Sequence, residues 1–373
     1  MKLFGRILAM ALKEVMHIQR DPQLLIYALV FPIAMILLFG YGVTFDIDKI
    51  PLVVVNQDRS VEAQKLVGSF TSSDAFLDIA DRQRASTIEP LFRRGVAKAA
   101  LVIPKDFERD IKRGGMASAQ LLVDGSDDHV AAVGLGYANA IALASSERRL
   151  TALVGDVAPP VSARVRTLFN PELSSTVFLV PGLMVVILVM IAVMLTALTV
   201  AREYERGSME QLFATPVGKI DIILGKLGPY FVLGLVQVLI VLVLGIGLFG
   251  VPMRGSVFLL FCIASLFLLA MLMQGLLISV MTRNQVLASQ LAAISTLLPS
   301  MLLSGFIFPI SGMPLILRGL AHVLPATYLV DALRGVMLRG NGIGVVWPDA
   351  LALAAYFSVM LFVAVGRFKR RVG

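Results

Sequence analysis

Apolar segments long enough to cross a bilayer recur along this chain. A helix that spans the hydrocarbon core of a membrane needs about 20 mostly apolar residues. The segments contain no Asp, Glu, Lys or Arg, and they predict an α-helical polytopic membrane protein with six transmembrane helices. They lie at residues 22–45, 173–201, 227–253, 255–282, 284–317 and 350–366, so the last five spans fall within 173–366.

The fifth apolar segment is longer than one span requires. Pro299, Pro309 and Pro314 interrupt it, and the pattern predicts a helix from about 285 to 308. Residues 309–347 then carry several charged side chains among apolar ones. We expect short helices there that lie in the outer interface or re-enter the membrane. Irregular backbone at that depth is tolerated only where it is buried in protein or lines a cavity.

The composition agrees with a membrane protein. Hydrophobic residues make up 57% of the 373 residues and charged residues only 16%, whereas soluble domains have about 45–50% and about 25%. A net charge of +8 could indicate nucleic acid, but the basic residues flank the apolar segments, so we expect no nucleic-acid partner. One Cys provides no disulfide framework, and three scattered His provide no metal-site spacing.

The basic residues of the short loops predict the orientation. Lys and Arg gather in the loops that are cytoplasmic if the N-terminus is cytoplasmic. Both termini, including the basic tail at 367–373, are therefore predicted to be cytoplasmic. Residues 1–21 form an amphipathic pattern with a basic face, which predicts a helix in the cytoplasmic interface. A soluble helix that packs on a partner is the alternative.

The long segment between the first two spans, residues 46–172, is predicted to be an inserted extracytoplasmic α/β domain, because strand and helix patterns alternate along it. Its predicted strands and helices lie at 50–55, 61–70, 97–103, 107–112, 119–123 and 130–154. Asp124, Asp127 and Asp128 follow the last strand. We interpret them as turn and helix-cap residues, with a cation site as the alternative.

The loop between the second and third spans has a local pattern of its own. Gly207 breaks the chain, and Ser208 with Gln211 forms a capping-box pattern at the start of a short helix. Thr215 is placed to cap a second helix that has Pro216 in its first turn. We therefore expect a rigid elbow with an apolar face.

This loop, residues 202–226, closely resembles the signature of the ABC-2 type permease family, Glu-x-x-x-Gly-Ser/Thr-x-Glu-x-Leu-x-x-Thr/Ser-Pro. The matching residues are Glu203, Gly207, Ser208, Glu210, Leu212, Thr215 and Pro216. Val54–Asp58, Val102–Phe107 and Asp124–Asp127 resemble motifs of the subgroup with a large extracytoplasmic domain after the first transmembrane helix. The resemblance extends over the whole chain.

The resemblance implies a non-catalytic permease in a bacterial inner membrane that exports its substrate with ATP hydrolysed by a separate cytoplasmic ATPase subunit. ATP and Mg²⁺ are then bound by that partner, and no cofactor is bound by this chain. A second permease chain (identical or paralogous) and membrane lipid are further implied partners, and a periplasmic adaptor is a candidate partner. The resemblance also places the N-terminal helix and the loop at the ATPase contact. The seven matching residues are thus predicted to couple ATP hydrolysis to transport, the alternative being that they only cap and turn the loop.

The sequence contains no Gly-x-x-x-x-Gly-Lys-Ser/Thr motif that would cradle a nucleotide, so any use of ATP has to come from a partner. Spans with few polar groups favour an amphipathic or lipophilic cargo. An ion-coupled secondary carrier, one alternative, usually buries charged groups in its spans, and the apolar segments contain no Asp, Glu, Lys or Arg. A membrane-anchored sensor or assembly protein, the other alternative, would need only one or two spans.

Small residues recur every four positions in the fifth apolar segment. Small side chains at this spacing let helices approach closely. The pattern predicts a dimer seam or a substrate path lined by hydroxyl groups, with ordinary packing against a neighbouring span as an equal alternative. The residues are Ala288, Ala292, Thr296, Ser300 and Ser304.

Overall fold

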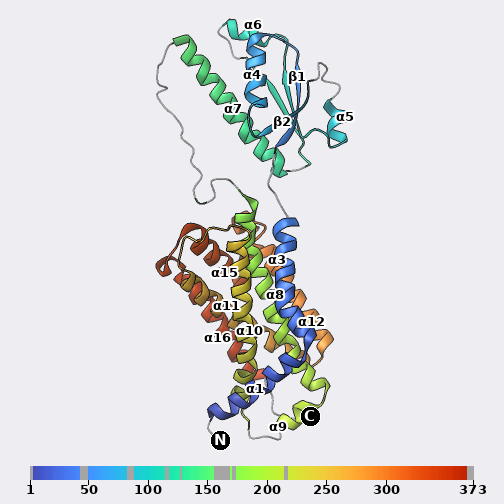
Figure 1. Ribbon diagram of the computed structural model, residues 1–373, viewed down its shortest axis with the longest axis vertical. Helices are drawn as coiled ribbons and strands as arrows, with labels where there is room; N and C mark the ends of the chain where they lie inside the picture. Colours follow the sequence, from blue (N-terminus) through green and yellow to red (C-terminus); the bar gives the residue numbers. More distant parts are fainter. Residues whose placement is uncertain are drawn as a thin grey trace. The chain divides into compact units, whose positions relative to one another are not determined.

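A computed structural model divides the chain into two units (Figure 1). One unit comprises residues 1–44 and 167–373, and the other comprises residues 45–166. The apolar helices belong to the first unit and a β-sheet to the second. The structure describes residues 3–42, 49–81, 88–113, 117–126, 128–154, 169, 174–213 and 217–367.

The first unit is a bundle of long apolar helices, preceded by the N-terminal helix α1 (Leu3–Arg20). Among the residues that the structure describes, six helical segments are long and apolar enough to cross a membrane, which confirms the predicted number of spans. Four are α8 (Ser175–Glu205), α10 (Lys219–Gly247), α11 (Val257–Thr282) and α16 (Ile343–Arg367). The first is α2 (Pro22–Leu25), the π-helical η1 (Ile26–Val30) and α3 (Phe31–Gly42); the fifth is α12 (Gln285–Ala292), the π-helical η3 (Ala293–Leu297) and α13 (Leu298–Leu303).

The segment after the fifth span folds as short helices. The 3₁₀ turn η4 (Ile310–Gly312) is followed by α14 (Leu315–Val323), α15 (Pro325–Arg334) and the π-helical η5 (Gly335–Arg339). The chain bends by 83° between α14 and the helix formed by α15 and η5. Short helices were expected here, and their place in the outer interface stays a prediction.

Several span boundaries differ from the sequence prediction. The third span runs from Lys219 to Gly247 instead of from 227 to 253, because Asp221 and Lys226 lie within the helix. The fifth span ends at Leu303 instead of 308, and the guanidinium of Arg334 donates to the carbonyls of Gly305 and Phe306 just beyond it. The last span starts at Ile343 instead of 350. The predicted span omitted residues 343–349 because Asp349 ends the uncharged segment. One charge near the end of a helix is compatible with a span.

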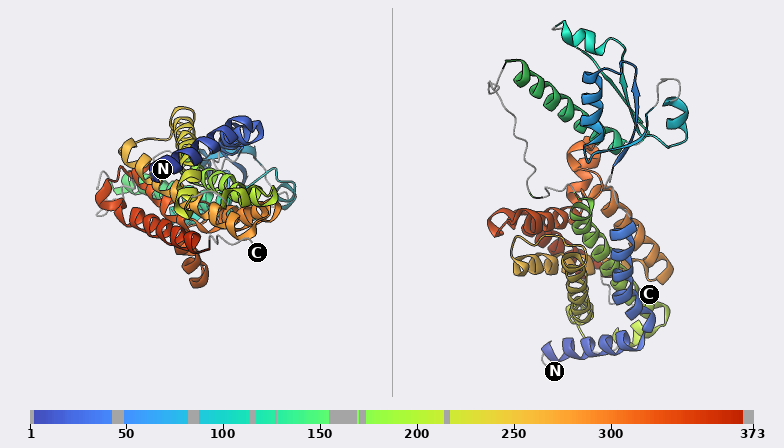
Figure 2. Two further views of the ribbon diagram at one scale, coloured as in Figure 1. Left: turned by 90° about the horizontal axis from the view of Figure 1, so that it is seen from below. Right: turned by 45° about the horizontal axis from the view of Figure 1, so that its top comes forward.

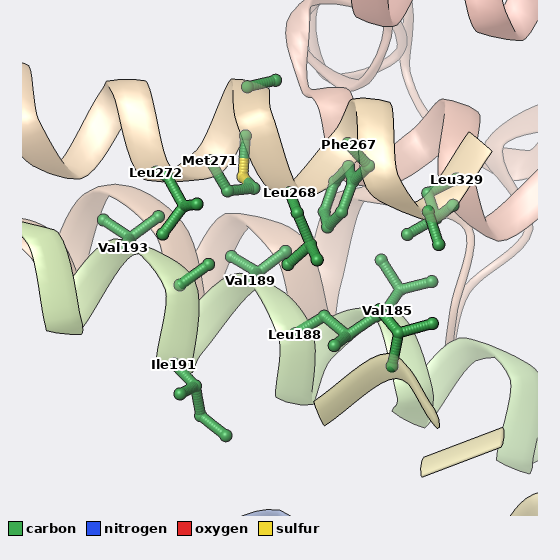
Figure 3. Close-up of a cluster of buried hydrophobic side chains, with 14 of the residues drawn as sticks. Val185, Leu188, Val189, Ile191, Val193, Phe267, Leu268, Met271, Leu272 and Leu329 are labelled. Carbon is green, nitrogen blue, oxygen red and sulfur yellow. The ribbon is translucent and has the colours of Figure 1, made fainter. Parts of the chain in front are cut away.

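Helix α8 lies at the centre of the bundle. It is apolar on every side, the pattern of a fully buried helix, and it packs against α3, α10, α11, α12 and α15. Figure 3 shows Val185, Leu188, Val189 and Val193 beside Phe267, Leu268, Met271 and Leu272, with Leu329 of α15 next to them. A displacement of α8 would therefore disturb most of the bundle.

The second unit is a small α/β domain, as predicted. Its sheet has the order β2-β1-β3-β4; β1 pairs in parallel with β2 and β3, and β3 pairs antiparallel with β4. Alternate residues of β1 point to opposite faces. One face packs against α4, α6 and α7, and the other packs against α5 (Figure 1). The strands are β1 (Ile50–Asn56), β2 (Phe76–Asp81), β3 (Ala99–Ile103) and β4 (Gln120–Val123), and the helices are α4 (Val61–Thr71), α5 (Ile88–Arg93), α6 (Phe107–Lys112) and α7 (Asp128–Val154).

The aspartates after β4 include a turn residue. Asp124 accepts hydrogen bonds from Lys98 at 2.9 Å and from the hydroxyl of Ser126 at 2.7 Å. Asp127 and the side chain of Asp128 lie outside the described residues. Within the described part of the chain, no group of three or more His, Cys, Asp or Glu could hold a metal ion. The contacts of Asp124 fit the turn interpretation.

Candidate coupling site

The loop that follows α8 turns sharply at Gly207. The φ angle of Gly207 is 68°, in the left-handed region that a residue with a Cβ rarely adopts. The short helix α9 (Ser208–Phe213) begins immediately afterwards and buries Met209 in the core of the bundle. Glycine at position 207 therefore allows the chain to reverse between two helices.

The caps in this loop differ from the sequence prediction. The hydroxyl of Ser208 donates to the carbonyl of Glu203 at 3.3 Å, and α9 starts at Ser208 itself. Ser208 thus satisfies a carbonyl near the end of α8, whereas the capping box would have used it for the start of α9. The N–H of Gly218 donates to Oδ2 of Asp221 at 2.9 Å, so a carboxylate in its own first turn caps α10.

Some predicted coupling residues lie outside the described residues. These are Thr215 and Pro216, together with the side chain of Leu212. Glu210 is exposed on α9. Because α10 starts at Lys219, its first turn begins after Thr215 and Pro216 instead of including them. Glu203, Gly207 and Ser208 are described in full.

Glu203 belongs to an ionic cluster that joins three helices and is buried except at Lys13, whose side chain is 40% exposed. Its Oε1 accepts a hydrogen bond from Nζ of Lys13 in α1 at 2.7 Å and lies 3.1 Å from Nζ of Lys226 in α10. Nζ of Lys226 also donates to Oε1 of Glu14 in α1 at 2.7 Å. Two carboxylates and two ammonium groups therefore neutralise one another inside the protein, where an unpaired charge would be costly.

Two further ion pairs hold the same end of the bundle. Arg6 of α1 lies 3.1 Å from Asp221 in the first turn of α10. Arg202 of α8 lies 3.1 Å from Asp21, the residue between α1 and α2. Together with the ionic cluster, these pairs connect α1 to α8 and α10 at several points along its length. A movement of α1 would therefore be transmitted to both spans.

Helix α1 also packs closely on α10, and Figure 2 shows it crossing one end of the bundle. A Cβ on Gly225 would lie 2.4 Å from Cβ of Met10 and 3.1 Å from the carbonyl oxygen of Ile7. Any larger residue at 225 would push the two helices apart. Met10, Glu14 and Ile18 form the buried face of α1. The contact is thus both ionic and apolar.

The family is shown by comparison with known proteins. The profile of the ABC-2 family transporter proteins matches residues 22–365, which is most of the chain. The chain belongs to the ABC-2 transporter family. The six spans, the inserted α/β domain and the elbow after α8 are therefore parts of an ABC-2 permease.

Three proteins of Escherichia coli (strain K12) are relatives of this permease. The probable multidrug ABC transporter permease YbhS is 35% identical over 98% of this chain and 97% of its own length. The probable multidrug ABC transporter permease YbhR is 26% identical over 99% of this chain and 100% of its own. The inner membrane transport permease YhhJ is 29% identical over 87% of this chain and 86% of its own.

Family membership shows which chain of the transporter hydrolyses ATP. In this family ATP is hydrolysed by a separate ATPase chain, and the permease itself binds no cofactor. The chain is therefore the multi-pass membrane subunit of an ABC transporter, and it requires an ATPase partner. The coupling role of the loop residues stays a prediction.

The small-residue stripe lies inside the permease subunit. Ala288, Ala292, Thr296, Ser300 and Ser304 are all buried, and α12, η3 and α13 pack against α8. The hydroxyls of Thr296 and Ser304 donate to carbonyls four residues earlier in their own helix. Packing within one subunit accounts for this face, while the dimer seam and the substrate path stay predictions.

Sequence reasoning missed the partners of Glu203. Lysines next to a span fit the orientation rule, so neither Lys13 nor Lys226 stands out. A recognisable signal was Glu14, a carboxylate in helical register with Met10 and Ile18 of α1. A charge on the packed face of a helix predicts a buried partner, because an unpaired carboxylate is too costly to bury.

Proposed function

We propose that this permease forms the membrane pathway of an exporter that moves an amphipathic or lipophilic substrate outward, driven by an ATPase that docks on α1 and α9. The observation that carries the proposal is the ionic cluster of Lys13, Glu14, Glu203 and Lys226. The cluster connects α1 and the end of α8 to α10, and α8 in turn contacts most of the bundle. A force applied at α1 or α9 would therefore reach the pathway.

The proposal includes the orientation and the partners. Both termini are cytoplasmic in an inner membrane, and the inserted domain is extracytoplasmic, where it would face a periplasmic adaptor. A second permease chain, identical or paralogous, completes the transporter. The similarity of both YbhS and YbhR to nearly the whole chain supports a pair of related permeases. Exposed apolar side chains on α12, α13 and α16 supply surface for lipid or for that second chain.

The first test is purification of the tagged permease from its native membrane in mild detergent. We expect a P-loop ATPase to co-purify in stoichiometric amount, and ATP hydrolysis to be measurable in the complex. A permease that purifies without any ATPase, in every detergent and lipid tried, would contradict the proposal.

The second test separates docking from folding. Glu210→Lys reverses the charge of an exposed side chain on α9, so we expect loss of co-purifying ATPase or of substrate-stimulated hydrolysis while the permease remains folded. Glu89→Lys in α5 of the inserted domain is the matched control, since it makes the same change at another exposed glutamate. Equal ATPase recovery and equal transport in both variants would remove α9 from the docking surface.

Gly207→Pro tests the elbow itself. Proline fixes φ near −65°, whereas Gly207 has a φ of 68°. We expect hydrolysis and transport to be uncoupled while the thermal stability of the spans changes little. Normal transport by this variant would show that the turn at 207 does not transmit the ATPase movement.

A further inference from the structure

A cavity of about 450 Å³ lies at the end of the bundle that carries the ionic cluster. Its walls come from α1, from the segment Asp21–Tyr27, and from the last turns of α8, with Tyr230 of α10. This volume is in the range of small-molecule sites, about 300–1,000 Å³. Three members of the ionic cluster, Lys13, Glu14 and Glu203, line the cavity.

Both long walls of the cavity change from apolar to charged residues toward the same end. Along α8 the lining begins with Met194 and Leu198 and ends with Arg202 and Arg206, the residue that follows the helix. At 1.5 Å per residue, this face is about 18 Å long. On the opposite side the lining runs from Tyr27 and Leu24 back to Asp21. Both walls are thus apolar at one end and charged at the other, which suits an elongated amphipathic molecule.

Three carboxylates and three cations line the cavity, and Lys226, just outside the lining, adds a fourth cation. Arg202 is paired with Asp21, and Lys13 is paired with Glu203. Glu14, which also lines the cavity, is neutralised by Lys226. The guanidinium of Arg206 and the imidazole of His17 have no ion-pair partner among the residues that the structure describes. The lining carboxylates are therefore already matched, and a basic group remains for a ligand.

We propose that this cavity binds one anionic amphipath, with a carboxylate, sulfate or phosphate head beside Arg206 and an apolar tail along Leu24, Tyr27 and Leu198. Arginine presents planar N–H donors that match the oxygens of such heads. If the proposed function holds, this is where the cargo enters from the leaflet on that side of the membrane. The cavity then assigns the substrate class that the spans leave open.

Photolabelling tests the site directly. The full chain is placed in phosphatidylcholine nanodiscs and irradiated with a medium-chain fatty acid that carries a diazirine in its tail. The matched alcohol and amine serve as comparisons, and labelled residues are mapped by mass spectrometry. We expect the acid to label Leu24–Tyr27 and Met194–Leu198 about tenfold more than the alcohol, roughly the gain from one charge-assisted contact. Equal labelling by acid and alcohol, or stronger labelling by the amine, would overturn the proposal.

Two pairs of variants assign the effect to the cavity. Arg206→Gln should reduce acid labelling severalfold, whereas Arg20→Gln, an exposed arginine of α1 outside the lining, should not. Leu198→Trp should fill the cavity and abolish labelling, whereas Leu239→Trp, at an exposed position of α10, should not. Acid labelling that survives Leu198→Trp, or that falls equally in both arginine variants, would contradict the site.

Photolabelling in the presence of ATP distinguishes a transported substrate from a resident lipid, and it requires the complex with the ATPase partner. When ATP is added to the reconstituted complex, labelling by a cargo analogue should fall, because turnover empties the site. Labelling that is unchanged by ATP while hydrolysis continues would show a resident lipid and overturn the cargo assignment. Labelling of the permease alone needs no ATPase, so its failure contradicts the cavity site without touching the proposed function.

Discussion

The inserted domain and the helical bundle place charged and apolar side chains in opposite ways. In the domain, Arg93 and Glu89 form an ion pair with 78% and 74% of their side chains exposed, while β1 is largely buried. In the bundle, Lys226 and Glu14 pair with only 2% and 5% exposed, whereas Phe362 is 82% exposed.

The difference follows from what surrounds each region. Water solvates an exposed ion pair and penalises exposed apolar surface. Hydrocarbon tolerates apolar surface and penalises charge. Side chains such as Phe362 therefore need no protein cover, but Lys226 needs good partners. In the bundle a buried charge therefore indicates a specific partner. In the domain an exposed apolar side chain is the unusual feature.

The largest effect is expected from Lys226→Met. The change leaves Glu14 without its cation and Glu203 with one cation instead of two. Removing one member of a buried pair costs about 3–5 kcal/mol. We expect a clear drop in the thermal unfolding midpoint of the permease in detergent, and partial recovery when Glu14→Gln is added. A loss no larger than that of Arg93→Met at the exposed pair would break the comparison.

A somewhat smaller effect is expected from Leu52→Ala. This side chain is fully buried in β1, and emptying such a site costs about 2–5 kcal/mol. Hydrogen–deuterium exchange should rise across β1 and β3 while α8 is unaffected, because the two units have separate cores. Phe362→Ala, at an exposed position of α16, should change neither. Faster exchange in α8 of the Leu52→Ala protein would contradict separate stabilities.

A pH effect is expected at the turn after β4. The hydrogen bonds from Lys98 and Ser126 lower the pKa of Asp124 from 3.8 to about 2. Because the folded pKa is depressed, the stabilisation is complete above the unfolded pKa and is lost as pH falls through the folded one. The unfolding midpoint of fragment 45–166 should drop less between about pH 4 and about pH 2 in Asp124→Asn than in the wild type. Identical pH profiles would exclude Asp124 as a source of the dependence.

The smallest effect is expected from Glu89→Gln. An exposed pair within one helix contributes about 0.3–0.5 kcal/mol, and salt screens it further. The unfolding midpoint of the domain should therefore shift barely above measurement error, and high salt should remove the shift. A loss comparable to that of Lys226→Met would mean that exposure does not distinguish the two classes of ion pair.

Sequence reasoning recovered the elements with strong periodicity and missed those without it. Strands β1, β3 and β4 lie within or close to their predicted ranges because each is an apolar run ended by a turn residue. Strand β2 (Phe76–Asp81) was missed because its polar residues obscure the pattern of a strand at the sheet edge. Helix α5 was missed because it is short and contains Pro90.

The candidate site divides in the same way. Glu203, Gly207 and Ser208 could be found in the sequence because a local motif connects them. Their actual roles could not be found there, since Glu203 is 190 positions from Lys13 and Ser208 caps backwards onto α8. A motif records which residue types a loop requires. It does not record which distant helix presents the opposite charge.

By itself, the sequence determined which region lies in lipid and which in water, because the lengths and spacings of the apolar segments differ between the two surroundings. It thereby determined the six spans and the inserted α/β domain. Only the tertiary structure decided that α8 is central, that Lys13 and Lys226 share Glu203, and that a cavity opens between α8 and Asp21–Tyr27. These features depend on distances between remote segments, which are set by packing and not by local pattern.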